Sequence, residues 1–298
     1  MRVIEDGIHT DISIEEYHAN RTHISATQIK YARESLRHFK WYMDGKMDSG
    51  PKTCFGFGNS FELALLSPTE YLQKVAVVPD SDWLEEVKQA EPDMVKPRSS
   101  KIYQARKKEF EIASAGKYQI AETGPESFET IEEMLSSCYQ DEIIQSLIKG
   151  TEYQLSLFWT DPETGLKLKT RPDICKRKKN VIVNVKTIED GSPEQFSRDL
   201  VKYDYPIQAC IEMRGCIATG LMPVVDNYLW LVCEKSKPYN ATIYEFDQKD
   251  HGACMDALDF TLSKIAKAKE ANKWPGYSDR SDNQYGILTA NIPLWYRF

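Results

Sequence analysis

One run of β-branched residues constrains the fold of this chain more than any other feature. Residues 181–185 read Val-Ile-Val-Asn-Val, and Lys186 follows directly. Such a run is typical of a strand that is buried on both faces of a sheet. Because side chains alternate along a strand, Asn184 and Lys186 are expected to share one face, while Val183 and Val185 share the other.

A second strand-like run precedes this one and brings a carboxylate toward it. Residues 166–171 are followed by Pro172-Asp173, and a short polar turn then leads to residue 181. If the two strands pair, Asp173 reaches the edge where Asn184 and Lys186 lie. A carboxylate, a second oxygen ligand and a lysine at a buried strand end suit a hard divalent cation and an activated water. On spacing alone, a solvent-exposed Lys186 and a turn-forming Asp173 are an equally open alternative.

Composition limits the class of protein. The chain has 298 residues, a net charge of −7 and seven scattered cysteines without a C-x-x-C pair. We expect a globular protein with one large or two small domains, and neither a zinc ribbon nor a disulfide framework. The N-terminus carries acids where a signal peptide would be apolar, and no apolar run could span a membrane, so the prediction is a cytoplasmic protein with reduced thiols. The acidic charge argues against a general nucleic-acid coat protein, although cations lining one channel would still serve a nuclease.

Two helices are predicted near the N-terminus. Ser25 and Gln28 form a capping-box pattern that opens a helix to about residue 43. Gly56 and Gly58 then precede a helix over residues 59–66, which Pro68 ends. Glu62 lies in this helix between apolar neighbours, where an unpaired carboxylate is costly to bury. A metal or a basic partner is therefore favoured over a surface position for Glu62.

The rest of the chain divides into further predicted elements. We expect an irregular insertion over residues 72–98, helices at 99–115 and 125–149, and strands at 151–160 and 166–171 joined by a tight turn at 161–165. Helices at 192–202 and 206–215, strands at 227–233 and 241–246, a helix at 249–272 and an irregular tail from residue 274 complete the prediction.

A row of cations on the strand at 166–171 has two open interpretations. Lys167, Lys169 and Arg171 alternate along one face and lead toward Asp173. Such a row could guide phosphates to a metal site, or it could be the polar face of an edge strand.

Four stretches, in order, resemble the RecE (exonuclease VIII) type phage recombination exonucleases, a branch of the PD-(D/E)XK nuclease superfamily. They are residues 23–30, 57–71, 158–173 and 205–209, and Asp173 is followed eleven positions later by Asn184-Val-Lys186, as in the superfamily signature. The resemblance spans roughly residues 14 to 275.

The resemblance implies the fold and the organisation of the chain. The fold would be α/β, with an αβββαβ core in which helices flank a mixed central sheet, and with helical N-terminal additions. Residues 1–298 would form a single exonuclease domain that carries a helical insertion at 72–150 and an irregular tail at 274–298.

The resemblance also implies the site. Glu62, Asp173, Asn184 and Val185 would hold magnesium, or manganese in its place, and Lys186 would orient water and the scissile phosphate. Gln208 matches the glutamine that helps to hold the catalytic water and the lysine. The catalytic set would thus be Asp173, Asn184, Lys186, Gln208 and Glu62.

Asn184 departs from the pattern, because the superfamily has aspartate or glutamate there. An amide oxygen can bind a hard cation but brings no negative charge, so metal binding and cleavage should be weak. The asparagine is either an inactivating substitution, since it is nearly isosteric with aspartate, or the mark of a degenerate member. The first is favoured because the other motif positions are intact, and Asn184→Asp is then expected to raise cleavage by orders of magnitude.

The function that the resemblance implies is end resection of DNA. The chain would degrade one strand of double-stranded DNA from its ends, 5′ to 3′, and leave single strands for a RecT-like annealing protein. By the same resemblance, the protein would form a homo-oligomeric ring around DNA. It would be encoded by a phage or prophage and would act in the cytoplasm of a bacterial host. A catalytically inactive DNA-binding module, for which Asn184 argues, and an endonuclease or resolvase are the alternatives.

Overall fold

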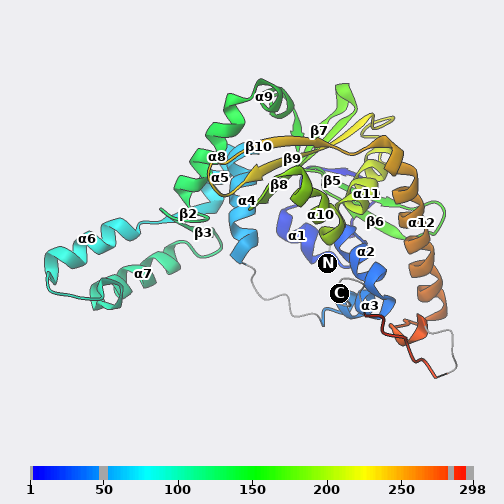
Figure 1. The fold of residues 1–298 in the computed structure, drawn as a ribbon, viewed down its shortest axis with the longest axis horizontal. Helices are drawn as coiled ribbons and strands as arrows, with labels where there is room; N and C mark the ends of the chain where they lie inside the picture. Colours follow the sequence, from blue (N-terminus) through cyan, green and yellow to red (C-terminus); the bar gives the residue numbers. More distant parts are fainter. Residues whose placement is uncertain (1–2, 47–52, 281–284, 293–298) are drawn as a thin grey trace.

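The computed structural model describes residues 3–46, 53–280 and 285–292, and side chains from residue 56 onward in the second range, up to residue 279. A mixed sheet with helices on both faces forms the body of the molecule, and a pair of helices extends from it as an arm (Figure 1). This is the α/β architecture that the sequence predicted.

The strands of the described residues form two larger sheets. One has five strands in the order β10 (Ala241–Glu245), β9 (Asn227–Glu234), β8 (Val181–Ile188), β7 (Ile174–Lys176) and β4 (Glu152–Tyr153). The other has three in the order β1 (Gly7–His9), β5 (Ser156–Thr160) and β6 (Lys167–Thr170). Only the β8–β9 pair of the larger sheet is parallel, and its other neighbours are antiparallel. The larger sheet is therefore mixed, and β8 lies in its middle.

Strand β8 is buried on both faces, as its β-branched run predicts. Val181, Val183 and Val185 pack in a cluster with Phe61 of α4 (Thr53–Leu66). Ile182 packs on the opposite side with residues of α11 (Tyr205–Ala218). The alternation predicted for this strand is confirmed, and it turns Asn184 and Lys186 toward α11.

Two glycines let helices approach these strands closely. A Cβ atom on Gly215 of α11 would lie 2.7 Å from Thr170 Cγ2 and 2.8 Å from the Trp159 ring, a distance that packed atoms do not adopt. A Cβ atom on Gly58 would lie 3.2 Å from Thr187 Oγ1 at the end of β8. Gly56 and Gly58 lie inside α4 rather than before it, which corrects the predicted start of this helix. Close contact with the sheet accounts for a glycine within the helix at position 58.

Two of the predicted helices are each divided by a capping residue. The helix expected from Ser25 to residue 43 is α2 (Ala26–Glu34) followed by α3 (Leu36–Met43), because Ser35 is extended and its Oγ accepts from the backbone N–H of His38. The helix expected at 125–149 is α8 (Phe128–Gln140) followed by α9 (Glu142–Ile148), with Asp141 as the cap between them. Short polar side chains compete for backbone donors and end helices in this way.

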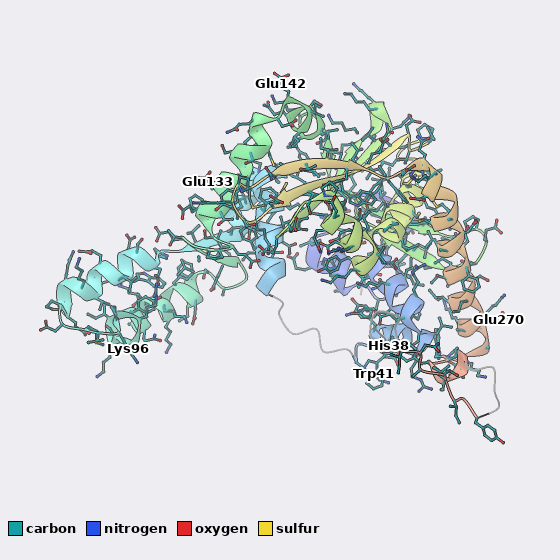
Figure 2. All side chains as sticks on the ribbon, in the orientation of Figure 1. His38, Trp41, Lys96, Glu133, Glu142 and Glu270 are labelled. Carbon is teal, nitrogen blue, oxygen red and sulfur yellow. The ribbon has the colours of Figure 1, made fainter. Side chains whose placement is uncertain are left out.

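The insertion predicted as irregular at 72–98 is ordered. It begins in the last turn of α5 (Pro68–Lys74) and contains β2 (Val75–Val78) and α6 (Asp80–Ala90). The elements η1 (Pro97–Ser99), α7 (Lys101–Ala113) and β3 (Tyr118–Ala121) follow. Strand β2 pairs with β3 in parallel, and Trp83 of α6 packs edge-on against Tyr103 of α7. The two helices form the arm, with Lys96 at its far end (Figures 1 and 2). The prediction was wrong because β2 finds its partner only beyond α7, and local sequence does not show such a pairing.

Three further helices are close to their predicted positions: α10 (Pro193–Tyr203), α11 and α12 (Gln248–Ala271). The short helix α1 (Ile14–Ala19) was not predicted. The segment after α12 has only the short η3 (Ser278–Arg280) among its described residues. The six cysteines with described side chains are free thiols. Over the described ranges, no helix is both long and apolar enough to cross a membrane.

Lys169 points into the protein and cannot guide phosphates, so that interpretation of the cationic row is wrong for this residue. Its side chain is 1% exposed, and its Nζ donates to the carbonyls of Tyr17 and, at 2.8 Å, Asn20. Arg171 is half-buried at the wall of a cleft, and its guanidinium donates to Ser156 Oγ at 2.8 Å. Burial lowers the pKa of Lys169 to about 7. The lysine therefore joins the N-terminal segment to β6.

We predict that Lys169 makes stability depend on pH above neutrality. Its pKa is about 7 in the folded chain and 10.5 without burial, so the unfolded chain binds more protons between these values. The free energy of unfolding should therefore rise with pH in this window, by at most ~1.4 kcal/mol per pH unit from this group. Urea unfolding from pH 7.5 to 9.5 should show a shallower rise for Lys169→Met than for the wild type.

Lys167→Met is the matched control, because Lys167 lies two residues earlier on the same strand and is exposed. It should keep the wild-type slope. Identical slopes for Lys169→Met and the wild type would show that the buried lysine does not titrate in this range.

Candidate active site

A cleft of about 1200 Å³ gathers most of the residues that the sequence singled out. Its wall includes Glu62 from α4, Asp173 from the segment before β7, Val185 and Lys186 from β8, and Gln208 from α11. Segments far apart in the sequence thus meet at one edge of the larger sheet. Asn184 lies directly behind this wall and is 1% exposed.

Asp173 is tied to the strand that carries the lysine. The backbone N–H of Val185 donates to Asp173 Oδ2 at 2.7 Å. Since the N–H and C=O groups of one strand residue point to the same side, the Val185 carbonyl also faces the edge where Asp173 lies. Burial raises the pKa of Asp173, and Lys186 and the Val185 N–H oppose this shift.

Glu62 extends from α4 into the same cleft as Asp173. Gln154 Nε2 donates to Glu62 Oε1 at 2.7 Å. Gln154 has a φ of +47° and interrupts the predicted strand 151–160 between β4 and β5, so its side chain turns toward α4. Burial, and then the carboxylate of Asp173, raise the pKa of Glu62 to about 8. Sequence analysis did not identify Gln154, because the left-handed conformation that turns it has no signal in a glutamine.

Lys186 is held from α11. Its Nζ donates to Gln208 Oε1 at 3.2 Å and lies 4.4 Å from the centre of the Tyr205 ring. The structure thus brings the predicted lysine and glutamine into direct contact. A cation fixed by a neutral amide and an aromatic face keeps its charge available to a third group.

Asn184 faces a carboxylate that the sequence analysis missed. Its Nδ2 lies 3.5 Å from Glu212 Oε1, and Glu212 is 2% exposed. Gln208 Nε2 also donates to Glu212 Oε1, at 2.9 Å, and the hydroxyl of Tyr228 donates to Oε2 at 2.8 Å. Burial, and then Asp173, raise the pKa of Glu212 to about 7. Asn184 Oδ1 is buried without a hydrogen-bond partner in the described part of the chain.

A signal for Glu212 was present in the sequence. It lies four residues after Gln208, and residues at this spacing share one face of a helix. It also lies between Ile211 and Met213 in an apolar helix, the same setting that pointed to Glu62.

The arrangement offers both charged and neutral oxygens to a cation. Within the described ranges, no three side chains of histidine, cysteine, aspartate or glutamate gather closely enough to enclose an ion by themselves. A divalent ion held here would therefore use neutral oxygens as well as acids. The neutral oxygens that the neighbouring strand residues offer are the unpartnered Asn184 Oδ1 and the Val185 carbonyl.

We predict that the charge of Glu62 opposes folding when no cation is bound. Its pKa is raised from 4.5 to about 8, so the folded chain binds a proton that the unfolded chain has lost in this window. The free energy of unfolding therefore falls, relative to that of Glu62→Gln, as pH rises from 4.5 toward 8. In EDTA, the variant should match the wild type near pH 4.5 and melt higher at pH 8.

Glu163→Gln serves as the control, because Glu163 is an exposed acid in the turn between β5 and β6. It should track the wild type at both pH values. A Glu62→Gln variant that melts no higher than the wild type at pH 8 would contradict the prediction.

Comparison with known proteins supports the same fold. The family profile described as "PDDEXK-like domain of unknown function (DUF3799)" matches residues 25–284. The crystal structure of a "Putative exonuclease" from Eubacterium rectale is similar, with a TM-score of 0.59, 12% identity, and coverage of 96% of this chain and 97% of that one. A second solved structure, SSO0001, has a TM-score of 0.29 and 14% identity over 72% of this chain and 87% of that one. No curated protein matches the sequence significantly. Because the profile covers most of its length, the chain belongs to this family of PDDEXK-like domains.

Proposed function

We propose that the chain is a metal-dependent exodeoxyribonuclease that acts on the ends of double-stranded DNA. The observation that carries the proposal is the meeting of Glu62, Asp173 and Lys186 in one cleft, at the edge of the strand that bears the signature. Two acids and a fixed lysine are the groups that metal-assisted hydrolysis of a phosphodiester requires.

The residues present fit a divalent cation. Glu62 accepts its hydrogen bond from a neutral amide, and Lys186 and Arg171 act on its charge only through space. Asn184 Oδ1 is a buried oxygen that lacks a partner there. Glu62, Asp173, Asn184 and the Val185 carbonyl would hold magnesium or manganese. Such an ion, when bound, makes a coordinated water more acidic and neutralises charge on a phosphate oxygen.

The protein groups do the positioning. Gln208 and Tyr205 hold the Lys186 ammonium at the wall of the cleft, where it can stabilise charge on the scissile phosphate and orient water. Gln154 holds the Glu62 carboxylate. The hydrogen bond from Val185 fixes the Asp173 carboxylate against β8, the strand that carries the lysine.

Several lysines accompany the cleft. Lys30, Lys74, Lys202 and Lys235 line it together with acids such as Glu34, Glu189 and Asp190. The wall is thus of mixed charge, in keeping with the net charge of −7. DNA would therefore be held by individual contacts between lysines and phosphates, and not by a uniformly positive surface.

The finer features of the proposal follow the resemblance to the RecE type. Likeness to a "Putative exonuclease" over almost the whole of both chains supports action on ends. Digestion of one strand, 5′ to 3′, would supply single strands to an annealing protein of the RecT type, and a homo-oligomeric ring would keep the enzyme on DNA. An inactive DNA-binding module is the second candidate, because position 184 lacks the usual acid.

We predict that the purified chain degrades linear duplex DNA in magnesium and leaves covalently closed circles intact. An enzyme that starts at ends needs a terminus, whereas an endonuclease does not. Gel analysis of both substrates, with EDTA as the control, measures this. Cutting of the closed circle would instead favour the endonuclease, and binding to linear DNA without cleavage would favour the inactive module.

We predict that Lys186→Ala slows cleavage by about 100-fold or more, because a cation at the reacting phosphate is lost. Its effect on affinity should be small, with the salt dependence of binding lowered by about one ion. Cleavage in magnesium and binding in calcium give the two values.

Lys178→Ala is the control, since Lys178 is exposed in η2 (Arg177–Lys179), the turn before β8. It should cleave like the wild type. If Lys186→Ala cleaves normally but no longer binds, Lys186 is an ordinary phosphate contact and the active-site assignment is wrong.

A further inference from the structure

We propose that Glu212 supplies the negative charge that position 184 lacks, and that it acts on the bound cation through the amide of Asn184. The inference rests on the divalent cation of the proposed function. In this arrangement Asn184 is the ligand, and Glu212, which itself lines the cleft beside Asn184, is the positioning residue that holds the amide.

The contact between β8 and α11 brings the two residues together. Asn184 and Lys186 lie two residues apart on one face of β8, and Glu212 and Gln208 lie four residues apart on one face of α11. Each strand residue meets one helix residue: Asn184 meets Glu212 at 3.5 Å, and Lys186 meets Gln208 at 3.2 Å. Gln208 donates in turn to Glu212. The lysine and the asparagine are thus linked through the helix.

Glu212 dictates the orientation of the Asn184 amide. A carboxylate only accepts hydrogen bonds, so the Nδ2 donor of Asn184 turns toward Glu212. The amide oxygen is left without a partner among the described residues. Donation to a carboxylate polarises the amide and makes its oxygen a stronger ligand. Metal-binding histidines are oriented and made more basic by carboxylates in the same way.

A purely structural role explains Glu212 poorly. It is 2% exposed, and none of the lysine, arginine or histidine side chains in the described ranges forms an ion pair with it. A buried charge without a cationic partner is costly. Glutamine would fill the same space and could still accept from Tyr228. An acid rather than an amide at this position is explained by a cation that gains from its charge. The nearby lysine, Lys186, already donates to Gln208, which leaves a bound cation as the partner.

The inference changes what an acid at position 184 should do. With Glu212 in place, the chain as written already has its third carboxylate, so Asn184→Asp alone should not raise cleavage by orders of magnitude. In the Glu212→Gln background the same change should restore what was lost, because the charge returns to the strand.

Manganese binding to the full-length chain without DNA tests the inference by calorimetry at pH 8, with magnesium-dependent cleavage of linear duplex measured in parallel. Glu212→Gln should weaken manganese binding by at least about 10- to 100-fold, the range for groups that orient metal ligands. Asn184→Asp/Glu212→Gln should bind close to the wild type. Asn184→Ala should bind manganese more weakly although Glu212 remains. This variant provides the test if Glu212→Gln fails to fold.

Asp199→Asn is the matched control, because Asp199 is a 7%-exposed acid that lines the same cleft from α10. It should bind manganese like the wild type. Unchanged affinity in Glu212→Gln or in Asn184→Ala would overturn the inference, as would a double variant that stays as weak as Glu212→Gln.

The parallel assays separate this inference from the proposed function. Cleavage by the wild type, with manganese affinity that does not depend on Glu212, leaves the function standing and overturns the inference. Manganese affinity that depends on Glu212 and is restored by the double variant, with no cleavage of any DNA, supports the inference and overturns the function. A wild-type chain that binds no manganese overturns both.

Discussion

The position of α11, which packs closely on β5 and β6 and reaches β8 through its side chains, is the constraint on which the rest of the site depends. Gly215 allows the helix to lie directly on Thr170 and Trp159, nearer than any side chain would permit. At that depth, Gln208 and Glu212 reach the polar face of β8 and hold Lys186 and Asn184. Packing far from the chemistry thus sets the distances within it.

Electrostatics at this edge favour a cation. Glu62, Asp173 and Glu212 all have raised pKa values, with burial as the leading cause in each case. Asp173 raises the pKa of both glutamates, so each glutamate and Asp173 oppose each other's ionisation. A folded chain that keeps such a group of acids gives up stability that a bound ion would return. Functional sites commonly hold residues that destabilise the fold in this way.

Sequence reasoning located the central strand β8 better than it located that strand's neighbours. The predicted strand at 166–171 was expected to pair with β8, but it is β6 of the other sheet, and β8 pairs instead with β7. The run ending in Lys186 predicted a central strand because β-branched periodicity is a local property. Glu62 was found through its apolar neighbours, and the same argument, applied to α11, would have found Glu212. The sequence could not predict the role of Gln154 or the burial of Lys169, because each depends on a contact with a distant segment. Gln154 contacts Glu62 of α4, and Lys169 donates to the carbonyls of Tyr17 and Asn20. The pairing of β2 with β3 was missed for the same reason.

Strand residues two positions apart on β8 meet helix residues four positions apart on α11, and this spacing limits how many residues of β8 the helix can contact. Two strand residues advance about 6.6 Å, and four helical residues advance about 6 Å. The two advances differ by about 0.6 Å, which the geometry of two hydrogen bonds tolerates. At a third strand residue the difference would be twice as large, and the next helix residue would also have rotated away from the strand. One straight helix can therefore form hydrogen bonds with two residues of this strand face, and these are Asn184 and Lys186. Any further polar side chain at this place must come from another element, as Glu62 does from α4. A one-residue insertion in β8 would turn both polar residues into the opposite core at once.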